Sequence, residues 1–197
     1  MPAPMSIPNR THLVTVAAAV LVATIAHSQI AAAAQGSQAI APQARPAVIA
    51  ADEGERRFLR GGVAPLLIKV DPLTTGSRRM VLGTSDLPPG DSIGLHRHLR
   101  EDEILLIFRG RARVQLGRDF YTAGPGAAVF IPQGTCVAVA NTGTDTLTNI
   151  FIFSSPGFEQ VLRAVSSAPG EPPKRLSPAE RASAFRAGHA EAWPAGC

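Results

Sequence analysis

The chain has 197 residues and a formal net charge of +4, a length that favours one domain after any processing. Its basic residues are scattered, and one Trp and one Tyr offer little surface for base stacking. A nucleic-acid groove needs clustered cations and stacking aromatics, so this composition excludes nucleic acid as a partner. The mild positive charge is interpreted as a contribution to solubility.

The first 34 residues have the pattern of a secretory signal peptide. Arg10 and His12 precede an apolar run at 13–26, and small residues follow at 31–34. We expect cleavage after Ala34, with Ser28 as the second choice, and export to the periplasm or the extracellular space. The alternative is an uncleaved membrane anchor, but the apolar run is short for a span of about 20 residues. The remaining sequence offers no other transmembrane candidate.

Residues 35–62 lack a clear period and are interpreted as an N-terminal arm or linker. From 63 to 154 short β-rich runs alternate with Gly- and Pro-containing turns, which predicts an all-β antiparallel sandwich or barrel. The glycines of these turns are expected to serve tight turns rather than chemistry. The predicted strands lie at 66–70, 79–84, 103–108, 112–116, 127–131, 135–140 and 147–153.

Residues 155–197 form a different segment, a tail with two short helices. The first helix follows Pro156, and its apolar residues at 158, 161, 162 and 165 fall on one face. The second begins at a capping box formed by Ser177 and Glu180 and is expected to run to about Ala192. We expect both helices to lie against the outside of the barrel.

The chemically specific residues are His96, His98 and Glu103. Side chains two apart in a strand share a face, so the two imidazoles stand roughly 6–7 Å apart and can reach one ion. A turn at 99–102 would bring Glu103 beside them. Such a site suits iron, manganese, nickel, copper or zinc, and it leaves coordination positions for water, substrate or dioxygen.

These residues belong to a longer pattern that resembles the first motif of the cupin superfamily: Gly90-x5-His96-x-His98-x4-Glu103-x6-Gly110. The run Gly126-x5-Pro132-x-Gly134-x2-Val137-x3-Asn141 resembles the second motif, at the short separation of single-domain bacterial cupins. The resemblance covers about 64–153. It implies an antiparallel jelly-roll barrel with a divalent metal in its mouth, held by His96, His98 and Glu103.

Val137 departs from this family pattern, because the second motif normally supplies a histidine ligand there. Three consequences compete: three protein ligands with extra water, weak binding of the metal, or a polar pocket that binds none. Cys136 is adjacent, but strand alternation turns it to the opposite face unless a bulge brings it inward as a ligand.

Other residues near the motif have structural interpretations. Cys136 and Cys197 are the only cysteines; a buried thiol and a free terminal thiol are favoured over a bridge within or between chains. Glu101 and Asp102 are expected to be solvated turn residues, and Arg97 a surface charge. The run 104–108 is expected to be core on both faces. His189 is expected to be exposed on the second helix.

Three functions compete. The first is a metal-dependent enzyme acting on a small molecule, as many cupins are dioxygenases and others isomerases or decarboxylases. The second is a non-catalytic small-molecule-binding module with a degenerate metal site, and the third is a structural domain of a larger assembly. Resemblance to cupins implies a homodimer formed by pairing of sheets. The sequence identifies neither the substrate nor a separate general base.

Overall fold

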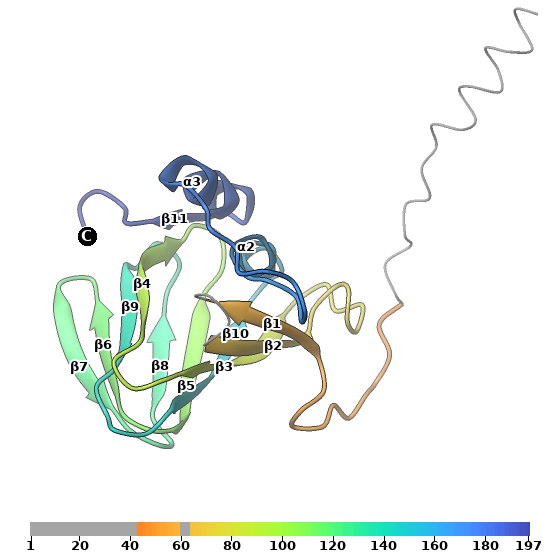
Figure 1. Ribbon diagram of the computed structural model, residues 1–197, viewed down its shortest axis with the longest axis horizontal. Coiled ribbons are helices and arrows are strands. Elements are labelled where there is room, and N and C mark those ends of the chain that lie inside the picture. The colour runs from red at the N-terminus through yellow and green to blue at the C-terminus, as the bar shows by residue number, and fades with distance from the viewer. Residues whose placement is uncertain (1–42, 60–63) are drawn as a thin grey trace, which may run out of the picture. The chain divides into compact units, whose positions relative to one another are not determined.

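The computed structural model describes residues 43–59 and 64–197 (Figure 1). The predicted signal peptide at 1–34 and the first part of the predicted arm lie outside the described residues. Over the two described ranges, none of the helices is long and apolar enough to cross a membrane.

The described strands form two antiparallel sheets that face each other, as a jelly roll requires (Figure 1). The first sheet has the order β1 (Glu55–Leu59), β2 (Ala64–Val70), β3 (Val81–Leu87), β10 (Leu147–Phe153), β5 (Glu103–Arg109) and β8 (Ala128–Ile131). The second has the order β11 (Ala190–Ala192), β4 (Ser92–His98), β9 (Val137–Asn141), β6 (Ala112–Leu116) and β7 (Asp119–Ala123). The predicted all-β jelly roll with short C-terminal helices is confirmed.

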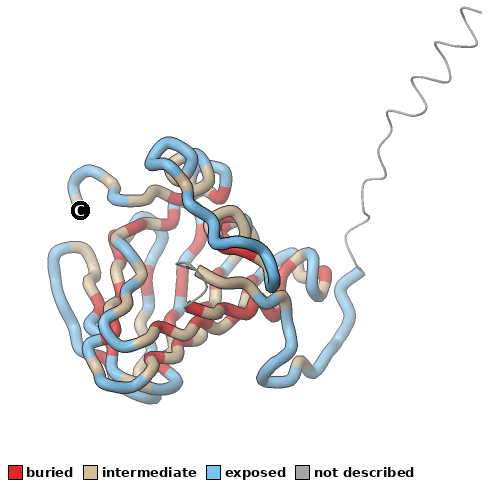
Figure 2. The backbone as a smooth tube through the Cα atoms, in the orientation of Figure 1, coloured by how far each residue is buried: buried red, intermediate tan, exposed pale blue. Residues whose placement is uncertain are grey.

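The core lies between the inner faces of the two sheets, and its residues come from every second position of the strands. In β10, Leu147, Asn149, Phe151 and Phe153 are buried, whereas the positions between them are half-buried. Figure 2 shows the same alternation along the neighbouring strands. The glycines predicted at tight turns, Gly90, Gly110, Gly126 and Gly134, all adopt positive φ.

Three parts of the sheets differ from the sequence interpretation. Residues 55–59, expected within an arm, form β1 and pair with β2. Residues 119–123, expected to begin with a turn, form the largely exposed edge strand β7. The run 104–108 is not core on both faces: Ile104 and Phe108 are exposed, because the first sheet buries only its inner side here.

The tail does not lie against the outside of the barrel. Helix α2 (Phe158–Val165) contributes Phe158 and Val161 to the hydrophobic core, and α3 (Pro178–Ala187) packs on α2. The predicted apolar face of α2 and the Ser177–Glu180 capping box are both confirmed. We call residues 158–193 the C-terminal cover, because they lie over one end of the two sheets (Figure 1).

The second helix ends at Ala187, five residues before the predicted end. A Cβ on Gly188 would come within 2.3 Å of a Val161 methyl group, so only glycine permits this approach of α3 to α2. The chain then forms β11, whose residues Ala190 and Ala192 pair with His98 and His96 of β4. The residues expected to form the last turn of the second helix therefore form a strand at the edge of the second sheet instead.

Helix α2 is tied to the first sheet by a partly buried charge network. The Arg163 guanidinium donates to carboxylates of Glu55, on β1, and Asp71, which follows β2, at 2.5 Å each. Burial alone would raise the pKa of Asp71, but hydrogen bonds from Thr74 and Arg163 hold it below its ordinary value. A buried charge whose partner is removed is costly, so this network fixes α2 against β1.

The end of the chain, four residues beyond the cover, is covalently attached beside the second sheet. Cys136, just before β9, forms a disulfide with Cys197, with the two Cα atoms 5.8 Å apart. The expectation of two separate thiols is therefore wrong. Spacing alone could not reveal the bridge, because β11 is what brings the tail back beside β4 and β9.

We expect Cys197→Ser to lower the free energy of unfolding by about 2–4 kcal/mol, because a bridge spanning 61 residues constrains the unfolded chain. Urea unfolding of the oxidised protein measures the change. Cys136→Ser and the double variant serve as matched controls, and all three should lose the same amount. Equal stability of wild type and variants, or a double variant that loses twice as much, would contradict the bridge.

Candidate metal site

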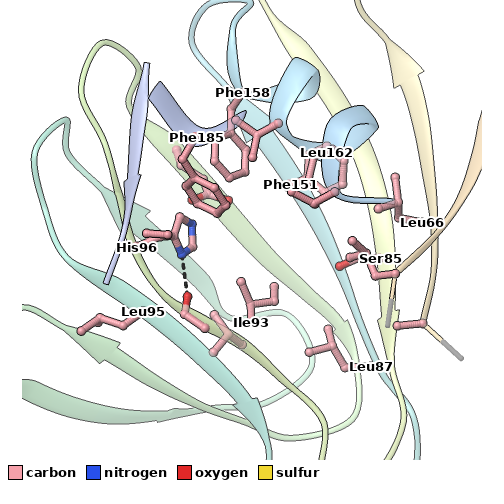
Figure 3. A pocket seen from close by; sticks show the side chains of 18 of the residues that line it. Leu66, Ser85, Leu87, Ile93, Leu95, His96, Phe151, Phe158, Leu162 and Phe185 are labelled. Carbon is pink, nitrogen blue, oxygen red and sulfur yellow. Dashed lines mark hydrogen bonds between the residues drawn. The ribbon is translucent and has the colours of Figure 1, made fainter. Parts of the chain in front are cut away.

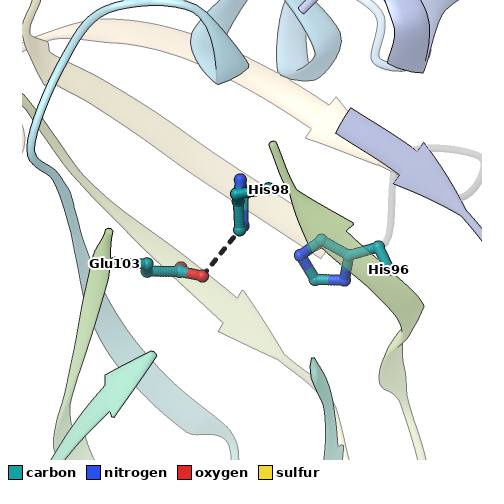
Figure 4. A group of neighbouring side chains, drawn as sticks. All are labelled: His96, His98 and Glu103. Carbon is teal, nitrogen blue, oxygen red and sulfur yellow. Dashed lines mark ion pairs between the residues drawn. The ribbon is translucent and has the colours of Figure 1, made fainter. Parts of the chain in front are cut away.

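The three predicted ligands meet at one end of the space between the sheets. His96 and His98 lie on the same face of β4, and Glu103 is the first residue of β5 (Figure 4). All three are buried, and one ligand atom from each lies within 4.8 Å of the others. Strand alternation and the turn at 99–102 thus place the side chains as the sequence predicted.

The two imidazoles have different partners. Nδ1 of His96 lies 2.9 Å from the carbonyl oxygen of Gly94, which can only accept, so this nitrogen carries the proton. Nε2 is then the His96 nitrogen available to a metal. In His98, Nε2 lies 3.0 Å from Oε2 of Glu103, and Nδ1 lies 3.5 Å from Oε1 of Glu101.

This difference separates the pKa values of the two histidines. Burial lowers the pKa of His96 to about 4, and the neighbouring charge of His98 acts in the same direction. Burial also opposes a charged His98, but the carboxyl groups of Glu101 and Glu103 outweigh it and raise the pKa of His98 to about 9. Near neutral pH the metal-free protein therefore holds a proton on His98, and His96 is neutral.

Glu101 is the main correction at this site. It was expected to be a solvated turn residue, but its side chain is fully buried and faces His98. Asp102 is exposed as expected, and accepts a hydrogen bond from the backbone of Gln133. Because side chains alternate through the turn, Glu101 and Glu103 point inward and Asp102 points outward.

Arg97 and His189, two other residues near the site, have surroundings that differ from those expected. Arg97 does point away from the histidines, but it is half-buried and its Nε donates to Glu191 of β11 at 2.5 Å. His189 is not helical: it follows α3 with a positive φ, is partly buried, and its Nε2 lies 3.0 Å from a guanidinium nitrogen of Arg100. Both residues help to attach the cover beside β4.

The donor set fits a divalent metal. Both ring nitrogens of His98, both carboxyl oxygens of Glu101 and Oε2 of Glu103 are buried without a hydrogen bond. Their contacts are the ion pairs of His98 with Glu101 and Glu103, and buried polar atoms seldom lack hydrogen bonds, so the cluster has room for a further partner. A cation between His96, His98 and Glu103 would satisfy the inward-facing atoms, and two imidazoles with a carboxylate are ordinary ligands for such an ion.

Val137 lies beside the cluster, at the position where the second motif normally has a histidine ligand. Val137 is fully buried and is the register partner of His96 across β4 and β9. The side chain beside His96 is therefore apolar, where a fourth ligand would otherwise stand. Cys136 faces away and is bonded to Cys197, which excludes it as a ligand.

The cover supplies functional-site residues that the sequence interpretation missed. The ring of Phe158 stacks on His96 with centroids 5.5 Å apart and meets His98 edge-on at 4.3 Å. His96 and Glu103 also line a cavity of about 200 Å³, together with residues of α2, α3 and β11 (Figure 3). The apolar face of α2 was visible in the sequence, but its docking on the histidines was not.

The fold and the cluster together indicate a class of protein. It is a two-sheet jelly roll with a pocket at one end, where two histidines and a carboxylate can hold a metal. Comparison with known protein families gives a match within the strand-rich part of the chain. Residues 83–153 match the cupin domain model, and this part of the chain is similar to a cupin domain in sequence and in fold.

Two solved structures are similar to this chain. A predicted oxalate decarboxylase from Thermotoga maritima has 21% identity and a TM-score of 0.50, and the match covers 55% of this chain and 99% of that one. KdgF from Halomonas sp. has 16% identity and a TM-score of 0.49, with 56% and 94% covered. No curated protein matches the chain.

We expect Glu101→Ala to weaken metal binding about 10- to 100-fold, because a carboxyl group on the far nitrogen fixes the ring that binds the metal. Competition between the protein and a chromophoric chelator for Zn²⁺ measures the change without relying on activity. Asp102→Ala is the matched control, since it removes the neighbouring but exposed carboxyl group. Equal affinities for the two variants would contradict this role for Glu101.

Proposed function

We propose that this chain is an exported, metal-dependent enzyme that acts on a small molecule, with dioxygenase-like chemistry. His96, His98 and Glu103 are the proposed ligands of the metal. The observation that carries the proposal is the pair of buried carboxyl groups around one imidazole. Glu101 and Glu103 lie beside opposite nitrogens of His98 in a buried cluster, and carboxyl oxygens gathered around an imidazole favour an added cation.

Each neighbouring residue has a distinct part in this proposal. A redox-active divalent metal with two imidazoles and one carboxylate supplies positions for substrate and dioxygen. Glu101 holds the His98 ring, and the Gly94 carbonyl holds the His96 ring. Phe153 and Phe158 exclude water from the histidines. Val137 leaves the side next to His96 without a protein ligand.

Elemental analysis tests the metal directly. We expect about one metal ion per chain after exposure of the purified protein to iron, manganese, nickel, copper and zinc in turn. His98→Ala should lose the metal, whereas His189→Ala should retain it, because His189 lies outside the cluster. Substoichiometric metal under all five conditions would refute the proposal.

The second candidate function is a non-catalytic small-molecule-binding cupin. Val137 favours it, because the apolar side chain removes one ligand while the cavity remains. A thermal-shift ligand screen distinguishes the two functions. Tight binding without turnover, unchanged in His96→Ala and Glu103→Ala, would support the binding module and make the metal site irrelevant to it.

The outer face of the first sheet supports a homodimer. Ile152, Ile104 and Phe130 are register neighbours on this face, and the last two are exposed. Asp86 and Arg109 flank the apolar row on the same face, joined through Thr148. A two-fold pairing of this face with a second copy would bury the row and place opposite charges together.

The mature protein should therefore be a processed, oxidised homodimer. Disulfides persist in oxidising compartments, so the Cys136–Cys197 bridge supports export. Intact-mass analysis should find a chain that begins after Ala34 and lacks the two thiol hydrogens.

Light scattering should give twice the protomer mass, and Phe130→Asp should give the protomer mass. A reduced full-length chain would refute export, and a strict monomer would refute the dimer.

A further inference from the structure

A second hollow of the molecule is an open groove between the segment before β1 and the loop after β2. Residues 43–49 contribute to its lining from the first segment, and Val70 and residues 75–79 from the second (Figure 1). Its volume is about 690 Å³, within the roughly 300–1,000 Å³ of ordinary small-molecule sites. Among the described residues, none lines both this groove and the cavity beside the cluster, so the two are separate.

Buried polar residues hold the two segments that form the groove. The Nζ atom of Lys69 donates to three backbone carbonyl oxygens of residues 50–53 at distances of 2.5–2.9 Å. The backbone carbonyl of buried Asp71 accepts from the amides of Thr75 and Ser77, at 3.1 Å each. The protein's own hydrogen bonds therefore shape the groove, and a ligand would lose less free energy in ordering it.

The charge that lines the groove has one sign. Arg45 comes from the segment before β1, and Arg78 and Arg79 come from the loop. The described residues of the lining include no carboxylate, and none of the three guanidinium groups has a hydrogen bond or an ion pair with a described residue. Arg97 and Arg163, by contrast, each bind a carboxylate. A hollow lined by cations alone concentrates anions.

We infer that this groove binds a phosphate monoester, with the phosphate held by Arg45, Arg78 and Arg79. Guanidinium groups pair with phosphate oxygens through two parallel hydrogen bonds. Near neutral pH a phosphate monoester carries about 1.5–2 negative charges, so it balances three cations better than a single carboxylate does. The site goes beyond the proposed function and requires no metal.

The rest of the lining restricts the organic part of the ligand. Ala47, Ile49 and Val70 provide apolar surface beside the arginines. The described lining contains no aromatic side chain on which a nucleobase could stack, so the groove does not favour a nucleotide. The same phosphate can belong to a soluble ester or to a lipid headgroup, and separate probes distinguish these two sources.

Calorimetry with three small probes tests the chemistry on the purified protein. Glycerol 3-phosphate carries the phosphate, glycerate carries a carboxylate in its place, and glycerol carries neither. We expect glycerol 3-phosphate to bind most tightly, glycerate more weakly and glycerol not at all. The affinity should fall as the salt concentration rises, because exposed charges are screened. Glycerate binding as tightly as glycerol 3-phosphate would overturn the assignment to phosphate.

Substitution of the arginines tests the location. Arg45→Gln, Arg78→Gln and Arg79→Gln should each weaken the binding of glycerol 3-phosphate about three- to tenfold, and the triple variant should abolish it.

A charge-matched control is the triple substitution of Arg111, Arg118 and Arg175 by Gln, three exposed residues outside the groove. It should leave the affinity within about twofold. Equal losses in the two triple variants would show an effect of net charge alone and refute the site.

Vesicles identify the source of the phosphate. Binding to phosphatidylcholine vesicles only when they contain phosphatidic acid, with no binding of glycerol 3-phosphate, would assign a lipid headgroup. Binding of glycerol 3-phosphate without binding to either vesicle would assign a soluble ester, and binding of both would assign a site open to either source. Each result supports the groove if the Arg45, Arg78 and Arg79 triple variant loses it, and binding to neither probe refutes the inference.

The cluster is excluded as the site by His98→Ala, which is expected to lose the metal. Its affinity for glycerol 3-phosphate should equal that of the wild type, because His98 is not part of the groove lining. Binding that is lost in His98→Ala but kept in the triple arginine variant would place the phosphate at the metal and refute the inference. A protein without metal that still binds through the arginines would refute the proposed function alone.

Discussion

The burial of two carboxyl groups around one imidazole is the constraint on which the rest of the structure depends. Glu101 and Glu103 contact opposite nitrogens of His98, and all three residues are buried. Burying such groups costs free energy unless each is paired, so the cluster is tolerated only where charge is balanced. The same imbalance makes this end of the barrel the place where a cation, and with it a reactive ligand, would be stabilised.

The cover explains how these groups stay buried. Phe158 contacts both histidines, and the helix that carries it is held by Arg163 at the first sheet. The β11 strand attaches the other side of the cover to β4, directly beside the histidines. The site thus lies between two attachments of one segment, and neither α2 nor β11 belongs to the stretch that matches the cupin domain.

The sequence predicted the parts of this site that follow from local periodicity. His96, His98 and Glu103 share a face because strand alternation and a four-residue turn require it, and Val137 lies beside His96 for the same reason. The role of Glu101 was missed because a turn was assumed to be solvated, whereas the cover buries it. The disulfide and β11 were missed because they depend on contacts between distant segments, which no local pattern encodes.

The bridge between Cys136 and Cys197 also has a consequence for the movement of the cover. The two cysteines are 61 positions apart in the sequence, and the segment between them includes β9, β10 and the whole cover. The bridge joins the end of the chain to the residue before β9, in the sheet that carries His96 and His98. While it is intact, the residues after β11 stay close to this sheet even when the non-covalent contacts of α2 and α3 are broken. The covalent loop therefore limits how far the cover can move away from the histidines.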